Sequence, residues 1–348
     1  MLKELSIYNI MFNEMIIHKK NLINNIKQVR FENPNSKICA MVKANAYGVG
    51  LNEVVQVIDE YVDFFGVACF FEAKMLNNLT SKKILIVGAL EFADIDETFS
   101  YACGSVNDIE YLISLNKSIN IHLKINSGMN RFGFKDIKSF KKALNLISSS
   151  KLIIEGIFTH FATCDEFVKE QTKVFKRFVK IVNAHGYYPI VHADNSFVNE
   201  KFNHHYDMVR IGFNLYNRNG GWFLPVVEIK SRVVQTYNVK KGELVGYNYR
   251  FVADKNMKIA VVPIGYADGF SLRYIGLNLV VKGVECKVLN VCMDCFMLDI
   301  SKVKIKKGEE IYVLNKFNSL TKYSSYEEIS DYEIMTRFSA IRAKRIIV

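Results

Sequence analysis

Short apolar runs alternate with helical patterns between about residue 10 and about residue 220 of the chain. Each apolar run has the length of one strand, and the patterns between them repeat their apolar residues at helical spacing. Strand–helix alternation predicts a parallel sheet with right-handed crossovers, and eight strands in about 200 residues match a (β/α)8 barrel. The expected strands are Ile38–Lys43, Phe64–Cys69, Ile84–Gly88, Tyr101–Ser105, Ile121–Asn126, Ile153–Thr159, Pro189–Ala193 and Asp207–Gly212.

Three helical patterns are the clearest. Ile16–Val29 precedes the first expected strand, and Ser139–Ile147 and Phe167–Asn183 lie between later ones. In each, apolar residues recur near the period of a helix and would form one face. These segments are therefore expected to cover the outside of the barrel.

The rhythm changes after about residue 220, where short β-rich segments follow one another with Lys-Gly turns between them. The pattern predicts a mainly-β domain, closed by one helix over Tyr326–Arg337 and a last strand over Lys344–Val348. We therefore expect an α/β chain, with an N-terminal barrel over 11–220 and a β-rich domain over 221–348. The expected strands of this domain are Val226–Val234, Glu243–Tyr249, Lys258–Pro263, Leu279–Val281, Glu285–Val291, Phe296–Ile300 and Glu310–Leu314.

Composition is that of a soluble globular protein, with 348 residues, 50% hydrophobic and 23% charged. The chain has no apolar run of about 18 residues and no apolar signal region at its start, so we expect neither a membrane span nor secretion but a cytoplasmic protein. The net charge is +11. Its lysines are scattered along helix faces, so no nucleic-acid partner is expected, and the positive field suits an anionic cofactor and a carboxylate substrate.

Seven cysteines are dispersed along the chain, which favours reduced thiols over a disulfide framework. Cys292 and Cys295 form a CxxC pair, which is found in redox motifs and in zinc sites. A zinc site needs a second ligand pair, and the chain has no second CxxC. The pair also lies in a β-rich region rather than at a strand–helix turn. We therefore expect no metal and interpret both cysteines as non-catalytic.

One lysine stands where an apolar run ends. Lys43 follows the run Ile38–Val42 and precedes a loop with two glycines, in the segment VKANAYGVG over 42–50. An apolar wall disfavours the ammonium form, and a neutral amine can form a Schiff base with an aldehyde cofactor. A lone lysine at a strand end more often extends to solvent, so the assignment depends on the other motifs.

This segment resembles the cofactor-lysine motif of alanine racemase, the pyridoxal-phosphate (PLP) enzyme that interconverts L- and D-alanine. Further motifs of that family recur in the family's order and together span most of the chain. An ordered set of this kind is very hard to obtain by chance. The resemblance also implies that residues 1–10 form a strand of the C-terminal sheet. The motifs are MNRFG (129–133), THFAT (159–163), NS (195–196), VRIG (209–212), PIGYADG (263–269) and CMD (292–294).

The polar residues of the barrel motifs share one topological position. Barrel enzymes keep their active sites at the carboxyl ends of the strands, and core packing gives polar groups no reason to gather there. A site at this rim therefore follows from the residues alone. The residues at or just after expected strand ends are Lys43, Arg131, His160, Asn195, Ser196, Arg210 and Gly212.

Phosphate binding is expected at the loops after the seventh and eighth strands. Ser196 offers a hydroxyl, and Gly212 allows its own N–H and that of Phe213 to approach an anion. A helix cap and a turn glycine would explain the same residues without a ligand. The resemblance implies that Asn195 belongs to the cofactor site and that Tyr47, Ser196, Gly212 and Phe213 hold the PLP phosphate.

Arg210 discriminates best between reaction types. Its family counterpart faces the pyridine nitrogen of PLP, and a permanently charged guanidinium cannot protonate that nitrogen. Related barrel decarboxylases place an acidic residue there, so Arg210 favours a racemase. The resemblance further implies that His160 hydrogen-bonds Arg210 and that Arg131 contacts the cofactor's phenolic oxygen and the substrate carboxylate. Lys124 matches a family position that is open to carbamylation.

Racemisation removes a proton from one face of the substrate and delivers one to the other, so two bases serve better than one. Lys43 is one base, and Tyr266 matches the family's second base, provided by the partner subunit of a homodimer with shared active sites. Met293, also from the partner in the family, presents its backbone to the substrate carboxylate. A hairpin with an exposed aromatic residue is the simpler interpretation of the Tyr266 segment.

The chain departs from the family pattern at several positions that bear on selectivity and cofactor affinity, among them Ile211, Asn290 and Ile341. The prediction is a PLP-dependent alanine racemase that supplies D-alanine for peptidoglycan. The alternatives are a racemase for another amino acid such as serine, a barrel-fold decarboxylase, and a cofactor carrier without catalysis. Arg210 disfavours the second, and the β-rich domain disfavours the third.

Overall fold

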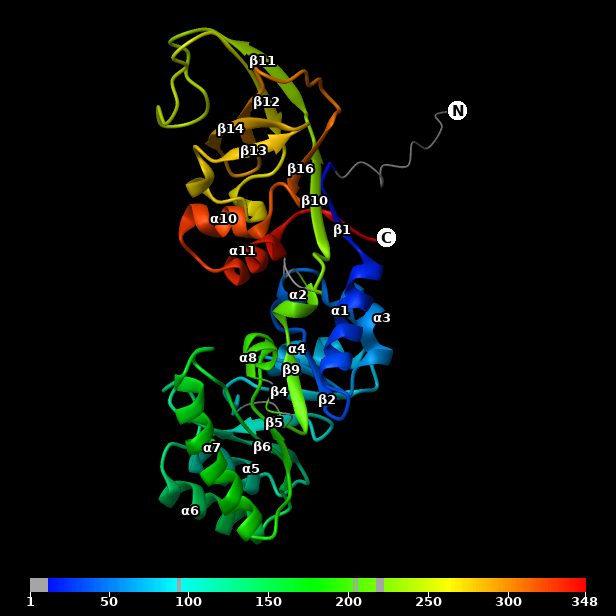
Figure 1. Ribbon diagram of the computed structural model, residues 1–348, viewed down its shortest axis with the longest axis vertical. Coiled ribbons are helices and arrows are strands. Elements are labelled where there is room, and N and C mark those ends of the chain that lie inside the picture. Colours follow the sequence, from blue (N-terminus) through cyan, green and yellow to red (C-terminus); the bar gives the residue numbers. More distant parts are fainter. Residues whose placement is uncertain (1–11, 93–94, 203, 205, 217–221) are drawn as a thin grey trace.

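The computed structural model describes residues 12–92, 95–202, 204, 206–216 and 222–348. The molecule is elongated, with an α/β part in the lower half of Figure 1 and a β-rich part above it. The predicted fold class, a (β/α)8 barrel followed by a mainly-β domain, is confirmed. Within the described residues, no helix has both the length and the apolar character that a membrane crossing requires.

Eight parallel strands close into a barrel in chain order, and β2 completes the ring by pairing with β9. All eight lie where the apolar runs predicted them, with ends that differ by a few residues. Their side chains are largely buried on both faces, which is why these strands read as continuous apolar runs. The strands are β2 (Lys37–Met41), β3 (Phe64–Val67), β4 (Lys83–Ile86), β5 (Ser100–Cys103), β6 (Asn120–Ile125), β7 (Ile153–Thr159), β8 (Ile190–His192) and β9 (Met208–Ile211).

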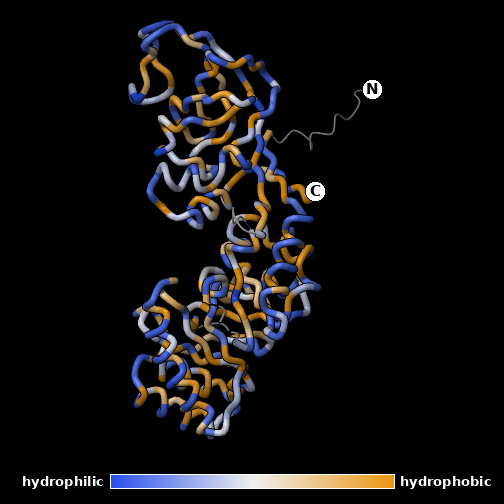
Figure 2. Tube along the Cα trace, viewed as in Figure 1, coloured by the Kyte–Doolittle hydropathy of each residue, from blue (hydrophilic) through white to orange (hydrophobic). Residues whose placement is uncertain are grey.

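Helices cover the outside of the barrel, and apolar and polar residues alternate along them (Figure 2). The patterns at Ser139–Ile147 and Phe167–Asn183 are confirmed as α6 and α7. α7 buries Val168, Phe175 and Phe178 against the barrel, so its amphipathic pattern reflects packing. The helices are α1 (Lys19–Glu32), α3 (Leu51–Ile58), α4 (Phe70–Asn77), α5 (Val106–Ser114), α6 (Ile137–Ser148), α7 (Phe167–Ala184), α8 (Ser196–Phe202) and α9 (Phe213–Tyr216).

The first helical pattern was placed too early. Ile16 and Ile17 belong to a strand, β1 (Glu14–Ile17), and the helix begins only at Lys19. β1 buries every second residue and lies between β10 and β17 in the C-terminal sheet, so its period is that of a half-buried strand. The strand predicted over 1–10 lies outside the described residues.

Two sheets form the β-rich part, with strand orders β16-β10-β1-β17 and β11-β12-β15-β14-β13. Its core contains packed aromatic rings, among them Phe270, Tyr274 and Phe296. The turns predicted at Gly242 and Gly283 are present, and both glycines have positive φ. The strands are β10 (Val227–Arg232), β11 (Gln235–Val239), β12 (Met257–Val262), β13 (Asn278–Val281), β14 (Val284–Val291), β15 (Phe296–Asp299), β16 (Glu310–Leu314) and β17 (Lys344–Ile347).

Two predictions for this part were wrong. Glu243–Tyr249 is no strand, because its end turns through positive φ at Asn248 and Tyr249 and leaves one isolated bridge. The helix predicted over Tyr326–Arg337 is two helices, α10 (Leu320–Glu327) and α11 (Asp331–Arg337), separated by Glu328 in a left-handed conformation. The strand β11 was not predicted, since most of its residues are exposed and it lacks a clear apolar alternation.

The β-rich part packs on the loop that follows β2. Arg345 of β17 donates hydrogen bonds to the backbone oxygens of Val49 (2.9 Å) and Gly48 (3.3 Å). A Cβ on Gly48 would lie 2.6 Å from the carbonyl oxygen of Met335 in α11, so only glycine permits this approach. The neighbourhood of α11 and the short helix α2 (Lys43–Tyr47) is visible in Figure 1.

Candidate active site

A cavity of about 520 Å³ lies at the carboxyl ends of the barrel strands. Tyr332 of α11 also lines it, so the β-rich part supplies one wall. The cavity has the size of a small-molecule site and lies where barrel enzymes bind their ligands. Its lining contains all nine barrel residues predicted for the cofactor site: Lys43, Tyr47, Arg131, His160, Asn195, Ser196, Arg210, Gly212 and Phe213.

Lys43 begins a left-handed turn. Ala44, Asn45, Ala46 and Tyr47 all have φ between 52° and 57°, although none of them is glycine. Left-handed backbone costs roughly 1–2 kcal/mol for each such residue, so the turn needs restraint from its surroundings. No sequence signal pointed to this turn, because the residues that favour it, apart from Asn45, are absent from 44–47.

Glu72 of α4 provides that restraint. Its carboxylate accepts hydrogen bonds from the backbone N–H of Ala44 (2.6 Å) and of Ala68 (2.7 Å), which ties the turn to the loop after β3. The side chain of Asn45 accepts a further bond from the N–H of Leu51 at 2.7 Å. The ammonium or amine of Lys43 is thereby held at the cavity by a fixed backbone. Glu72 was not predicted, since an acidic residue in the first turn of a helix is common.

The surroundings of Lys43 lower its pKa and so favour loss of its proton. Burial lowers the pKa of Lys43, and the nearby Arg131 lowers it further, while Glu72 acts in the opposite direction. The pKa of Lys124 is lowered to about 8, first by burial and then by Arg131 and Arg210. Lys124 donates to the backbone oxygen of Val87 at 2.9 Å. Among the described lining residues four carry basic groups and none is acidic, so the cavity attracts anions.

Tyr47, Ser196 and Gly212 form one corner of the cavity. A Cβ on Gly212 would lie 2.4 Å from the hydroxyl oxygen of Tyr47, so the absence of a side chain makes room for that hydroxyl. The N–H of Gly212 donates to Oγ of Ser196 at 3.2 Å. Burial raises the pKa of Tyr47 to about 12, so its hydroxyl remains a donor at neutral pH. Hydroxyls and a side-chain-free backbone suit a phosphate group.

Arg210 is fully enclosed and charged. Burial lowers its pKa to about 10, which leaves the guanidinium protonated at neutral pH. It donates to the backbone oxygens of Thr159 (2.8 Å) and Ala193 (3.0 Å) and to Nδ1 of His192 (2.7 Å). The resemblance implied a hydrogen bond between Arg210 and His160, whereas the histidine that accepts from Arg210 in the structure is His192.

His160 lines the same cavity in its neutral form. Burial and the charge of Arg210 lower the pKa of His160 to about 3. His192, the last residue of β8, was not predicted to contact Arg210, whereas His160 follows the end of β7. The direct pairing of β8 with β9 brings His192 against the guanidinium of Arg210.

Tyr266 and Met293 are not among the residues that line the cavity. They belong to one structural unit of the β-rich part, in which the N–H of Tyr266 donates to the backbone oxygen of Cys292 at 3.0 Å. Tyr266 and Met293 are 44% and 52% exposed as residues. Both are thus surface groups in one copy of the chain.

Ion pairs of Arg342 fix the conformation of the segment around Tyr266. Arg342 donates to both carboxylate oxygens of the buried Asp268 at 2.8 Å and binds Asp294 at 2.8 Å. This network joins the segments 263–269 and 292–294 to the end of the chain.

All seven cysteines are free thiols, and the described residues contain no group of three side chains that could hold a metal ion.

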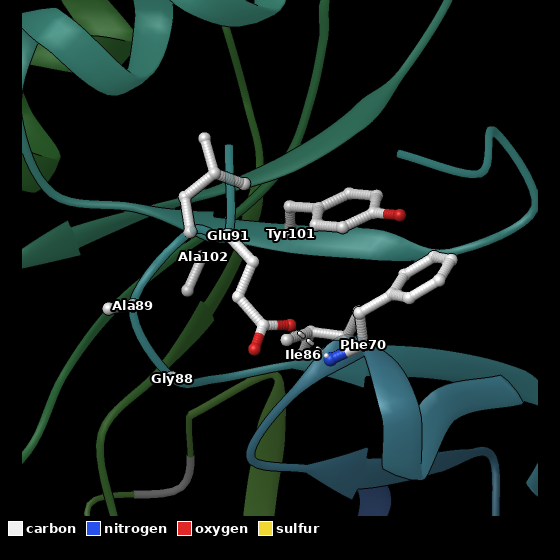
Figure 3. A pocket seen from close by; sticks show the side chains of 8 residues that line it. Phe70, Ile86, Gly88, Ala89, Glu91, Tyr101 and Ala102 are labelled. Atoms are coloured by element: carbon white, nitrogen blue, oxygen red, sulfur yellow. Dashed lines mark hydrogen bonds between the residues drawn. The ribbon is translucent and has the colours of Figure 1, made fainter. Parts of the chain in front are cut away.

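A second hollow, shown in Figure 3, lies between α4 and the strands β4 and β5. Phe70, Ile86 and Tyr101 give it apolar walls, and the carboxylate of Glu91 accepts a hydrogen bond from the N–H of Phe70 at 2.8 Å. It has no free volume for a ligand. We therefore take the cavity at the carboxyl ends of the barrel strands as the candidate active site.

Comparisons with known proteins agree with this arrangement. The chain matches the family models "Alanine racemase, N-terminal domain" over residues 17–219 and "Alanine racemase, C-terminal domain" over 226–347. Alanine racemase of Staphylococcus carnosus is 33% identical over 87% of this chain and 86% of its own. That of Fusobacterium nucleatum is 32% identical over 95% of this chain and 98% of its own.

Solved structures give the same result. Alanine racemase from Bacillus anthracis with bound L-Ala-P has a TM-score of 0.90 at 26% identity, covering 97% of this chain and 95% of that one. Alanine racemase from Bartonella henselae with covalently bound pyridoxal phosphate has a TM-score of 0.86 at 23% identity, covering 97% and 100%, and so matches in fold. Family models, relatives and structures together show that this chain belongs to the alanine racemase family of isomerases.

Proposed function

We propose that the protein is a PLP-dependent racemase that interconverts L-alanine and D-alanine with two bases, Lys43 and Tyr266 of the partner subunit. The observation that carries the proposal is the position of Lys43, whose pKa is lowered and which a strained turn fixes at the mouth of a barrel lined with basic groups. A relative in fold is described with covalently bound pyridoxal phosphate, which supports the choice of cofactor.

The residues of the cavity fit PLP. The corner of Tyr47, Ser196 and Gly212 matches its phosphate, because it combines two hydroxyls with a backbone free of a side chain. Arg210 offers a permanent donor to the ring nitrogen and cannot give up its proton at neutral pH. Bound there, PLP supplies an aldehyde for an amine and a ring that stabilises negative charge at the substrate's α-carbon.

The chain's own groups then divide the work. Lys43, whose pKa is lowered by burial and by Arg131, would hold the aldehyde of the cofactor through its amine and would serve as the base for the substrate's α-proton on one face. Arg131 binds the substrate carboxylate. His160, neutral at any physiological pH, and Asn195 complete the wall around the cofactor.

The proton on the opposite face is assigned to Tyr266 of the partner subunit. In one copy Tyr266 is exposed and outside the cavity lining, so a homodimer with shared sites is the assembly that gives it a role. Met293, in the same unit as Tyr266, would present its backbone to the carboxylate. The Arg342 network explains how that unit keeps its shape before a partner arrives.

The biological role we propose is the supply of D-alanine for peptidoglycan in the cytoplasm. The relatives named above are bacterial alanine racemases, and all seven cysteines are free thiols, as expected in a reducing compartment. None of the described residues that line the cavity is an acidic group in place of Arg210, which disfavours the decarboxylase alternative.

A racemisation assay with added PLP tests the proposal. We would offer a panel of L-amino acids, including alanine and serine, and measure the D-enantiomer formed. The expected result is the highest kcat/KM with alanine and none with the Lys43→Ala variant. A higher kcat/KM with serine than with alanine would show that serine is the preferred substrate. Racemisation by Lys43→Ala at the wild-type rate would refute the role of the lysine.

A further inference from the structure

A line of hydrogen-bonded polar side chains runs through the interior of the barrel, away from the cavity. Arg210 of β9 donates to Nδ1 of His192 on β8 at 2.7 Å, and Nε2 of His192 lies 2.8 Å from Nδ1 of His122 on β6. Nε2 of His122 lies 3.1 Å from the carboxylate of Glu155 on β7. A barrel interior is ordinarily filled by apolar layers, so this line departs from simple packing.

The line ends near the amino ends of the strands, opposite the cavity. Glu155 also binds Lys83 and accepts a hydrogen bond from Ser100, the first residues of β4 and β5. Glu155 is 7% exposed, while Lys83 is 59% exposed and reaches solvent. The line therefore connects the guanidinium at the active site with a carboxylate at the floor of the barrel.

The two histidines are fully buried and neutral. Burial and the charge of Arg210 lower the pKa of His192, and burial is also the largest cause of the lowered pKa of His122. Burial alone would raise the pKa of Glu155, but hydrogen bonds from His122, Lys83 and Ser100 outweigh it and lower that pKa to about 2. The line thus has a cation at one end, an anion at the other and two neutral rings between them.

The donors in this line can have only one order. A guanidinium only donates, so Nδ1 of His192 must accept, and its proton must be on Nε2. That N–H points to Nδ1 of His122, which must also accept and carry its own proton on Nε2. The last N–H then needs an acceptor, which is the carboxylate of Glu155. Each ring has its tautomer fixed by the next group along the line.

The surrounding residues are shaped to hold these rings. A Cβ on Gly156 would lie 2.1 Å from Nδ1 of His122, so only glycine leaves space for that imidazole. Phe158 stacks on His192 with ring centroids 4.8 Å apart and lies under the guanidinium of Arg210 at 5.0 Å. Asp194, a carboxylate near Arg210, is bonded instead to the N–H and Nδ1 of His204.

We propose that Glu155 is a positioning residue for Arg210 and acts through His122 and His192. By accepting from His122, the carboxylate fixes both imidazoles with the proton on Nε2, so that His192 always turns a lone pair toward Arg210. Without that acceptor the Nε2–H of His122 loses its partner, and this cost is relieved only when both rings take the other tautomer, which sets an Nδ1–H of His192 against an N–H of Arg210. The guanidinium would then lose its orientation toward the cavity. This inference rests on the proposed role of Arg210 at the ring nitrogen of PLP.

The first test measures the tautomers directly in the protein without cofactor. The chain has seven histidines, and 15N spectra of histidine-labelled protein report which ring nitrogen carries the proton. His122→Asn and His192→Asn identify the two signals. We expect both rings to be neutral and protonated on Nε2 at about pH 7. A proton on Nδ1 of His192, or a charged ring, would overturn the proposal.

The second test removes the acceptor. Glu155→Leu keeps the volume without an acceptor, whereas Glu155→Gln keeps one oxygen for His122 and releases the exposed Lys83. For Leu we expect a mixture of tautomers at His192 and a kcat lowered about 10-fold or more, with a smaller change in KM. For Gln we expect wild-type tautomers and a kcat within about 3-fold of wild type. Glu110→Leu is the control, because Glu110 pairs with Lys142 at the surface.

The outcomes separate this inference from the proposed function. If folded Glu155→Leu keeps the wild-type tautomers and kcat, or if Glu155→Gln loses as much activity as Leu, the inference is wrong. If Glu155→Leu does not fold, the tautomers of the wild-type protein decide. If the wild-type protein racemises no amino acid, the proposed function is refuted, while the tautomer measurement still accepts or rejects the role of Glu155.

Discussion

Replacing Glu72 by glutamine should loosen the turn that presents Lys43. Four successive residues, Ala44 to Tyr47, are left-handed, and at roughly 1–2 kcal/mol each they store about 4–8 kcal/mol of backbone strain. The carboxylate of Glu72 binds two backbone N–H groups, those of Ala44 and Ala68. Glutamine has one acceptor oxygen, so its NH2 group must face one of these donors.

The expected loss of stability follows from this unpaired N–H donor. A hydrogen bond to a charged group is worth about 1.5–3 kcal/mol, and an unpaired donor adds to the cost, so Glu72→Gln should destabilise the protein by about 2–3 kcal/mol. In a protein of this size the melting temperature should fall by about 2–4 °C. Because Lys43 leaves its fixed position, affinity for PLP should fall about 10-fold or more, since 1.4 kcal/mol corresponds to a factor of ten.

Two assays on the same preparation check this. Thermal unfolding without cofactor measures stability, and titration with PLP, followed by its absorption, measures affinity. Glu170→Gln is the control, because Glu170 forms an exposed pair with Lys173 on α7 and should change neither value. Unchanged melting and unchanged affinity in Glu72→Gln would refute the idea that this carboxylate restrains the turn.

Three further predictions concern other parts of the site. Gly212→Ala should displace the hydroxyl of Tyr47, which would lie 2.4 Å from the new Cβ, and weaken PLP binding in a titration about 10-fold without unfolding the protein. Because the pKa of Glu155 is lowered from 4.5 to about 2, the stability that its charge provides is complete above about pH 4.5 and is lost as the pH falls toward 2. In acid unfolding, the free energies of unfolding of Glu155→Gln and wild type should therefore converge near pH 2. A difference between them that stays constant with pH would contradict this. Tyr266→Phe should slow racemisation of L-alanine more than that of D-alanine in an isotope-exchange assay, and equal small effects would count against two bases.

The sequence predicted the barrel because its strands are buried on both faces and therefore appear as separate apolar runs. It predicted the rim residues because polar groups such as Lys43 and Arg210 at strand ends have no place in a core. β1 was misplaced, since Ile16 and Ile17 fit both a helical and a strand period. A second sheet had to be known before that choice could be made.

The remaining features depend on contacts between strands that the sequence does not display. His122 and His192 each lie in a mostly apolar run, and only the packing of β6 to β9 in the barrel joins them to Arg210 and Glu155. The left-handed turn after Lys43 contains no glycine, the residue from which such a turn is usually predicted. Likewise, the motif around Tyr266 is recognisable, but one copy of the chain leaves it outside the cavity.

The most direct test of the account is to identify the amine that holds the cofactor. The protein, incubated with PLP, would be treated with borohydride to make the link permanent, digested and mapped by mass spectrometry. We predict that the added pyridoxyl phosphate is found on Lys43 and that Lys43→Ala carries no label at a specific site. A label on Lys124 or another lysine, with Lys43 unmodified, would contradict the account.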